Sequence, residues 1–467
     1  MPTLRRFLRD DSGPDTDAVR AELHGMLPGM LVEQTAAVIL ENVNVYVMGF
    51  ISTAALAGVS QVTTINNILM NLFQAFATGG TVMVARCAGA GKRGAASRYA
   101  ASALVLGLSV SLLLSALFFA FGNSIIHLLF HAAEQNVLDA SQQFFRLTCL
   151  TPPLWFVYFQ CCGYLRCVGD TKRPMLVSIL LNGVSILGNL VFVGALGMGV
   201  TGSALAYLLS VAIGAMISLA MVLRKSFSIR PSFRSGNGQE ASAHSFRTVA
   251  RIAVPASVEN LMFNGSRIFI QIFLSGMGTV MISGNQVFNS VTSILMVPVM
   301  SLYYLTIPLV ARCTDGGDEA AIRRAADCLY HKTMRWSLVT GVAHLLLAVP
   351  LAWLFTRDPA AIRVGAIMLA LYAPSLVLQA DSFILPNVFK AAGDVKYAMV
   401  LSSLTAWGIR VLGTWFFGIV LGMRAYAIVL TQVLDYLVRT FFYHRRYLGQ
   451  KWLSCLQIDY HDRRRIV

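Results

Sequence analysis

Residues 174–223 read PMLVSILLNGVSILGNLVFVGALGMGVTGSALAYLLSVAIGAMISLAMVL and contain no Lys or Arg. A helix that crosses a bilayer needs about 20 consecutive apolar residues, so this stretch is long enough for two such helices. The short turn Gly197-Met198-Gly199 lies near its middle. The stretch therefore predicts a helical hairpin embedded in lipid.

The composition of the whole chain extends this prediction. The 467 residues are 56% hydrophobic and 13% charged, with a mean hydropathy of +0.64. Soluble domains carry roughly 25% charged residues, because their surfaces face water. Only helices and closed barrels satisfy their backbone groups in lipid. The apolar runs are long and continuous, unlike the ~10-residue alternating segments of a barrel. We predict an all-α polytopic membrane protein.

The positions of the cations predict the topology. Lys and Arg gather in seven clusters, at 1–20, 86–98, 166–173, 224–251, 312–335, 390–396 and 439–465. Each of the six cation-poor stretches between them is long enough for two helices, which predicts about twelve transmembrane helices. Because cytoplasmic loops collect Lys and Arg, we expect both termini on the cytoplasmic side of a bacterial inner membrane.

The distribution of Lys and Arg also predicts the binding partners of the protein. A net charge of +15 in a soluble protein would suggest nucleic acid, but here the cations flank membrane segments. We expect membrane lipids and a small-molecule substrate as partners, no nucleic acid, and a monomer. The eight cysteines show no zinc-ligand spacing, and the sequence has neither a Walker phosphate loop nor a catalytic-triad spacing. We expect neither an enzyme nor a bound cofactor, and no cleaved signal peptide.

A polar segment, KSFSIRPSFRSGNGQEASAHSF, divides the chain near its middle. The expected organisation is a cytoplasmic N-terminal segment at 1–25, an N-lobe at 26–224, a linker at 225–246, a C-lobe at 247–446 and a basic tail at 447–467.

The two halves resemble each other in sequence. Val84-Ala85-Arg86-Cys87 recurs as Val310-Ala311-Arg312-Cys313, and LRCVGDTKRPM at 165–175 is echoed by FKAAGDVKYAM at 389–399. These matches, with others in the same order, have offsets of 224 to 226 residues. With six helices in each half, both halves enter the membrane in the same orientation. Substrate sites of transporters lie between such repeats.

Four motifs resemble those of one transporter family. They are VARCAGAGKRGAA at 84–96, RCVGDTKRPM at 166–175, LGMGVTGSALAYLLS at 196–210 and AVPASVEN at 253–260. Together with the repeat, they resemble the multidrug and toxic compound extrusion (MATE) family over 26–444. The resemblance implies two six-helix lobes, alternating access, and antiport of organic compounds against Na⁺ or H⁺.

The sequence departs from the family pattern at two positions that bear on ion coupling. Members of the family commonly carry Asp in the first and fifth helices, where this sequence has Asn44 and Asn189. An amide cannot exchange a proton. Glu41 lies one turn before Asn44 and shares a helix face with Gln34. We therefore expect Glu41 to replace the missing N-lobe carboxylate. The alternative for Glu41 is an ion pair with a buried Arg. Glu33 lies closer to the cytoplasmic end of the same predicted helix.

The C-lobe holds three acidic candidates. Glu259 and Asp381 match acidic positions of the family, and the resemblance makes them the coupling pair for Na⁺ or a proton. Two carboxylates in close proximity raise one pKa, and oxygen ligands also suit Na⁺. No other metal ligands are expected. Asp435 is a further candidate, or a group near the cytoplasmic interface.

Mid-span cations and amides complete the expected substrate cavity. Arg267 continues a polar stripe with Asn264, and Asn285 and Asn289 lie four residues apart. Arg267 and Arg410 either form ion pairs with buried carboxylates or receive an anionic group of a substrate. Interhelical hydrogen bonding is the alternative for each amide.

Export of small organic compounds, drugs or organic cations, is thus the leading hypothesis from the sequence. The alternatives are a lipid-linked saccharide flippase of the same superfamily and a membrane receptor or channel without coupled transport.

Overall fold

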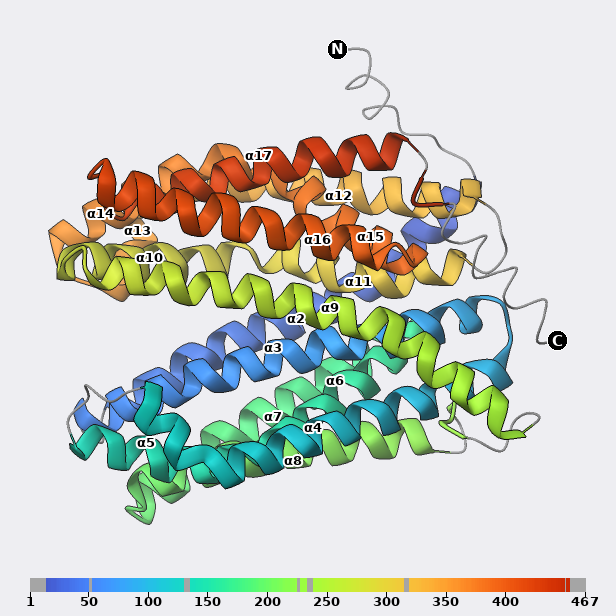
Figure 1. Cartoon of the computed structure of the whole chain (residues 1–467), viewed down its shortest axis with the longest axis horizontal. Helices are drawn as coiled ribbons and strands as arrows, with labels where there is room; N and C mark the ends of the chain where they lie inside the picture. The colour runs from blue at the N-terminus through green and yellow to red at the C-terminus, as the bar shows by residue number, and fades with distance from the viewer. Residues whose placement is uncertain are drawn as a thin grey trace. The chain divides into compact units, whose positions relative to one another are not determined.

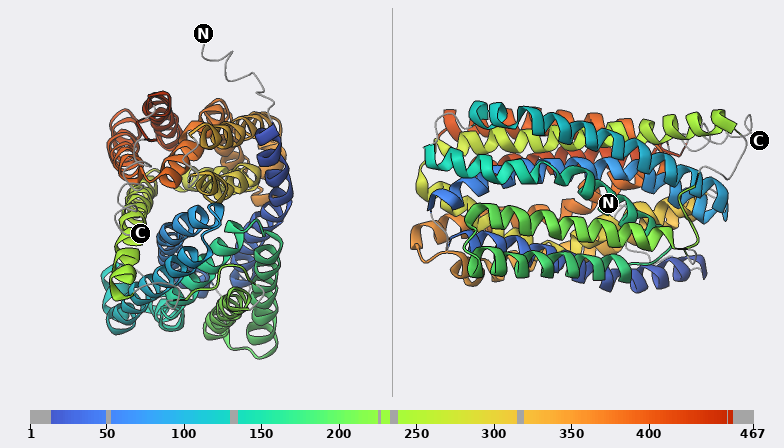
Figure 2. Two further views of the ribbon diagram at one scale, coloured as in Figure 1. Left: turned by 90° about the vertical axis from the view of Figure 1, so that its right-hand side faces the viewer. Right: turned by 90° about the horizontal axis from the view of Figure 1, so that it is seen from below.

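The computed structural model describes residues 14–49, 53–129, 135–224, 227–232, 238–314, 319–449 and 451–453. Every regular element among them is helical, which confirms the predicted all-α class. Within each half of the chain, neighbouring helices run side by side (Figure 1). The left view of Figure 2 looks along the helices and shows them packed as bundles.

The chain divides into two compact units, one from Pro28 to Ser257 and one that combines the residues up to Leu27 with those from Val258 on. Two helices cross the boundaries, α2 (Pro14–Gly49) and α9 (Gly238–Ser275). Each has a proline close to its boundary, Pro28 or Pro255. A proline inside a helix removes one backbone hydrogen bond and favours a bend there. The expected lobes at 26–224 and 247–446 stay a prediction.

The N-terminal unit is a bundle of helices. They are α3 (Thr53–Gly89), α4 (Arg93–Leu129), α5 (Gln135–Thr148), α6 (Thr151–Cys167), α7 (Lys172–Asn189), the π-helix η1 (Leu190–Ala195) and α8 (Gly199–Leu223). The adjacent Pro152 and Pro153 stand at the start of α6. Proline lacks a backbone N–H and is tolerated in a first helical turn, which explains why α5 ends just before them.

The C-terminal unit has more interruptions. Its elements are α10 (Thr279–Leu295), α11 (Val297–Cys313), α12 (Glu319–Leu346), α13 (Ala348–Phe355), α14 (Pro359–Tyr372), η2 (Ala373–Leu378), η3 (Ala380–Ile384), α15 (Leu385–Ala392), α16 (Val395–Thr405), η4 (Ala406–Val411), η5 (Thr414–Val420) and α17 (Tyr426–Leu448). The α10–α11 pair bends by 59° at Pro298. The repeat places Leu72 at the equivalent position of α3, which stays continuous. One proline thus accounts for the difference.

Membrane-crossing length and composition are met by six of the described helical segments, or by eight spans if each bent pair counts as one. Their outer faces carry large apolar side chains: Phe119 is 63% exposed and Leu354 is 73% exposed. A soluble monomer rarely exposes apolar surface on this scale. The described residues therefore support a multi-pass membrane protein.

Interlocking aromatic rings fill the interior of the N-terminal unit. Phe156 on α6 is fully buried, and its ring meets those of Phe73 and Phe76 on α3 edge to face, with centroids 6.4 and 6.1 Å away. Such pairs contribute about 0.5–1.5 kcal/mol beyond the area that they bury.

Removing this ring is expected to destabilise the unit. Phe156→Ala should lower the free energy of unfolding by about 3–5 kcal/mol, because it leaves a cavity among packed rings. Unfolding of the purified protein in detergent measures the change. Phe119→Ala, on an exposed face of α4, is the matched control and should change the free energy of unfolding by only about 0.5 kcal/mol. Equal losses for the two variants would contradict the packing argument.

Candidate functional site

Each unit buries a glutamate against a cation at the same position of the repeat. In the N-terminal unit, Glu33 on α2 pairs with Arg166 on α6 at 2.5 Å, with side chains 7% and 11% exposed. In the C-terminal unit, Glu259 on α9 pairs with Lys390 on α15 at 2.9 Å, with side chains 14% and 10% exposed. The glutamates are 226 residues apart and the cations 224, which are the offsets of the repeat. The two pairs are therefore equivalent.

The local sequence positions both cations in the same way. Arg166 and Lys390 each lie in the last turn of a helix, where a positive charge interacts favourably with the helix dipole. A glycine with a positive φ follows each, Gly169 at 84° and Gly393 at 94°. Glycine adopts this left-handed conformation without the steric cost of a Cβ. The Gly-Asp motif of the sequence thus ends the helix just beyond the paired cation.

Within the C-terminal unit, a chain of polar contacts continues from Glu259 to α16 and α17. Ser402 on α16 donates from its Oγ to Glu259 Oε1 at 3.0 Å, and this Oγ lies 3.1 Å from the hydroxyl of Tyr443 on α17. The backbone carbonyl of Ser402 accepts a hydrogen bond from Arg439 Nη2 at 3.1 Å. The glutamate pair is therefore linked to the interior of α16 and α17.

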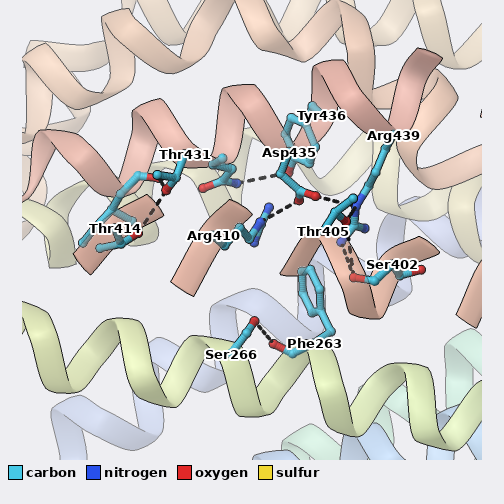
Figure 3. Close-up of polar contacts among 12 residues, drawn as sticks. Phe263, Ser266, Ser402, Thr405, Arg410, Thr414, Thr431, Asp435, Tyr436 and Arg439 are labelled. Carbon is cyan, nitrogen blue, oxygen red and sulfur yellow. Dashed lines mark hydrogen bonds and ion pairs between the residues drawn. The ribbon is translucent and has the colours of Figure 1, made fainter. Parts of the chain in front are cut away.

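That interior holds a carboxylate between two guanidinium groups (Figure 3). Asp435 on α17 is fully buried. Its Oδ1 accepts from Arg439 Nε and its Oδ2 from Arg410 Nε, both at 2.7 Å. Arg410 comes from η4 and is 6% exposed. Charge-assisted bonds of this kind are stronger than bonds between neutral groups. We name Arg410, Asp435 and Arg439 the Arg–Asp–Arg cluster.

Asp381 belongs to a different set of contacts. It lies in the π-helix η3 and is 4% exposed. Tyr330 on α12 donates to its Oδ2 at 3.3 Å, and His444 Nδ1 lies 3.3 Å from its Oδ1. Glu259 and Asp381, which the sequence predicted as a coupling pair, thus have different partners. π-helical turns are frequent at functional sites.

The structure describes several of the predicted cavity residues. Asn189 donates to the Ser185 carbonyl one turn earlier, and Asn264 donates to the carbonyl and side-chain oxygens of Asn260. These bonds lie within single helices. Asn285 is buried, Gln34 is half-buried, and Asn289 and Arg267 are exposed. Glu41 and Asn44 lie outside the residues whose side chains the structure describes. The role of each of these residues stays a prediction.

Sequence reasoning did not select Lys390 or Arg439, and it gave Glu33 a minor place. Lys390 and Arg439 belong to the cation clusters at 390–396 and 439–465, which the sequence places on the cytoplasmic side, yet the structure buries both side chains. The signal that identifies Glu33 is the repeat itself, because its offset to Glu259 is that of the other repeated residues.

In this arrangement the Lys390 ammonium group already neutralises the Glu259 carboxylate. A carboxylate paired with an ammonium group has two ways to stay neutralised inside a protein, the existing pair or an added proton or metal ion. A cation that bound to Glu259 would therefore have to displace the Lys390 ammonium group. The Lys side chain is long and flexible and can then change partner.

Known proteins resemble this chain over most of its length. The MatE family model matches residues 30–191 and 255–416, one segment in each half. An uncharacterized transporter of Bacillus subtilis, YisQ, is 23% identical over 437 residues, covering 91% of this chain and 93% of that protein. The probable multidrug resistance protein NorM of Thermotoga maritima is 22% identical over 413 residues, covering 87% of each.

Solved structures show the same fold. A mutant of the Vibrio cholerae MATE transporter VcmN matches with a TM-score of 0.85 at 17% identity, covering 95% of this chain and all of that one. A MOP superfamily transporter from Pyrococcus furiosus matches with a TM-score of 0.83 at 18% identity, covering 96% of this chain. Structures of this kind have 12 transmembrane helices in two lobes, which confirms the predicted fold class.

The contributions of Glu33 and Arg166 to the stability of the N-terminal unit are expected to depend strongly on each other. Glu33→Gln should lower the free energy of unfolding by about 3–5 kcal/mol, because Arg166 would be left buried without a counter-charge. The double variant Glu33→Gln with Arg166→Gln should lose less than the sum of the single variants. A double-mutant cycle on the purified protein measures this difference.

An exposed ion pair nearby provides the control. Arg173 and Asp170 lie 3.2 Å apart, with side chains 50% and 25% exposed. Arg173→Gln should cost no more than about 1 kcal/mol, because water replaces the lost partner. If Glu33→Gln proved no more destabilising than Arg173→Gln, the pair with Arg166 would not be a buried ion pair.

Proposed function

Because the chain belongs to the MATE family, we propose that it exports small organic compounds by antiport with H⁺ or Na⁺. It is a multi-pass membrane transporter and not an enzyme. A relative that covers 87% of this chain is named a probable multidrug resistance protein, which supports drugs as the class of exported compound.

The observation that carries this proposal is the contact of Glu259 with Lys390. Glu259 is the acidic residue of the AVPASVEN motif, and both members of the pair are largely buried. In the proposed cycle a proton or Na⁺ neutralises Glu259 and frees Lys390. Binding of the cation and binding of the substrate then favour different arrangements of these side chains, which is the requirement for coupled exchange.

Ser402 connects Glu259 to the Arg–Asp–Arg cluster. It contacts Glu259 through its hydroxyl and Arg439 through its backbone carbonyl. A change at Glu259 therefore alters the position of a residue that holds Arg439. We propose that this link lets the charge state of Glu259 act on α16 and α17.

The N-terminal unit provides a different kind of pair. Arg166 keeps its proton in a protein, so its charge stays opposite Glu33. We propose that the Glu33–Arg166 pair holds its helices together throughout the cycle. Glu41 stays the predicted exchangeable carboxylate of this unit, and Asp381 with its partners Tyr330 and His444 is a second candidate in the other unit.

We further propose a bacterial inner membrane as the location, with both termini cytoplasmic and the monomer as the working unit. The cation clusters beside the membrane segments support this orientation. Lipids are then the partners of the exposed apolar faces.

Glu259→Gln is expected to slow gradient-driven export by about tenfold, the size of a typical coupling between two sites. The amide keeps the shape of the side chain but cannot bind and release a proton. Export of a fluorescent drug from vesicles measures the rate, with a pH gradient and a Na⁺ gradient imposed separately. The gradient that drives export identifies the coupling ion.

Glu319→Gln is the matched control, because Glu319 is an exposed carboxylate at the start of α12. This variant should export at the rate of the unmodified protein. Glu41→Gln and Asp381→Asn in the same assay report whether either carboxylate shares the coupling role. Unchanged export by Glu259→Gln would remove Glu259 from the mechanism. The absence of gradient-dependent export for every compound would contradict antiport.

A further inference from the structure

The polar chain of the C-terminal unit contains more positive than negative groups. Its cations are Lys390, Arg439 and Arg410, and its carboxylates are Glu259 and Asp435. Each carboxylate is thus matched by one cation, and one positive charge is left over. Burying an unmatched charge is expensive, so the surplus calls for a compensating group.

The surplus is located at Arg410. Its Nε donates to Asp435, but Arg439 donates to that same carboxylate. Arg439 has further acceptors in Thr405 Oγ1, at 2.8 Å, and in the Ser402 carbonyl. Arg410 Nη2, in contrast, is buried and makes no hydrogen bond to the described residues. A water molecule would satisfy this donor but would leave the charge unmatched.

Aromatic rings fix the orientation of Arg410. The guanidinium carbon lies 5.0 Å from the ring centre of Phe263 and 5.5 Å from that of Tyr436. Ring faces attract cations, although more weakly than an anion does. Figure 3 shows Phe263 reaching from α9 toward the guanidinium groups. The guanidinium group of Arg410 is therefore held between aromatic rings.

The Arg–Asp–Arg cluster is not repeated at the equivalent positions of the N-terminal unit. At an offset of 225 residues, the positions equivalent to Arg410, Asp435 and Arg439 are Ser185, Ser210 and Gly214. All three are buried and uncharged in the N-terminal unit. The glutamate–cation pair is present in both units, whereas the cluster is present in one. The N-terminal unit thus forms its helical bundle without charges at these three positions.

We propose that Arg410 binds an anionic group, and that in transport this group is the carboxylate of the exported compound. The geometry suits a single carboxylate, which accepts hydrogen bonds from an arginine and supplies the missing negative charge. Phe263 and Tyr436 suit an aromatic or apolar body attached to it. Its assignment to an exported compound rests on the proposed function, while the anion site itself does not.

Binding of benzoate to the purified protein in detergent tests the proposal. Titration calorimetry at constant ionic strength should detect benzoate and should not detect benzylammonium, which has the same ring and the opposite charge. Arg410→Gln should weaken benzoate binding by about tenfold or more, the usual effect of losing a hydrogen bond to a charged group. Arg363→Gln removes an exposed cation of α14 and should bind benzoate as the unmodified protein does.

Two further variants separate binding from folding. Arg410→Lys keeps the charge but loses the planar group, and it should bind benzoate more weakly than the unmodified protein. Asp435→Asn removes a competing carboxylate and should bind benzoate more tightly, a direction that loss of structure would not produce. Thermal unfolding of each variant identifies those that retain the fold.

The outcomes distinguish the source of the anion. Competition by chloride at similar concentration would support the anion site and assign it to a free inorganic ion. Weak competition by chloride would support a carboxylate-bearing compound. No benzoate binding by the unmodified protein, or equal binding by Arg410→Gln, would overturn the proposal. Benzoate binding without gradient-driven export would remove the proposed antiport and leave the anion site standing.

Discussion

A charge inside a membrane-embedded bundle must be matched by an opposite charge, and this constraint organises the polar groups of the protein. Moving an ion out of water costs several kcal/mol even after the surroundings adjust, so the buried carboxylates of the described residues lie against cations or hydroxyl groups. Glu33 faces Arg166, Glu259 faces Lys390, and Asp435 lies between two arginines. A change in the charge of any one member would leave its partner buried without a counter-charge.

The internal repeat distinguishes the charged groups that both units share from those that only one unit has. The glutamate–cation pair appears in both units at equivalent positions, each followed by a glycine with a positive φ. This repetition marks the pair as part of the shared architecture. The difference between its two forms then matters, because a lysine carries a compact charge on a flexible stem, whereas an arginine carries a rigid planar group.

Asymmetry between the units is equally informative. Pro298 interrupts α10–α11 where Leu72 leaves α3 continuous, and charged residues replace small neutral ones at the Arg–Asp–Arg cluster. Both changes are concentrated in the C-terminal unit, whose π-helical turns η3 and η4 carry Asp381 and Arg410. The N-terminal unit is built from more regular helices and aromatic packing. The two halves of one ancestral pattern have thus acquired different local chemistry.

The sequence by itself determined the helical class, the membrane environment, the duplication and the family, because long apolar runs, the spacing of cations and repeated motifs are written along the chain. It also singled out Glu259, Asp381 and Arg410, since an ionisable residue within an apolar run needs a reason. Only the tertiary structure decided their partners. Lys390 and Arg439 fall in cation clusters of the sequence, yet both side chains fold inward. Lys390, near the end of α15, reaches Glu259 on α9, and Arg439 pairs with Asp435 one turn earlier on α17. Pairing depends on which helices pack together, and that information is distributed over the whole bundle.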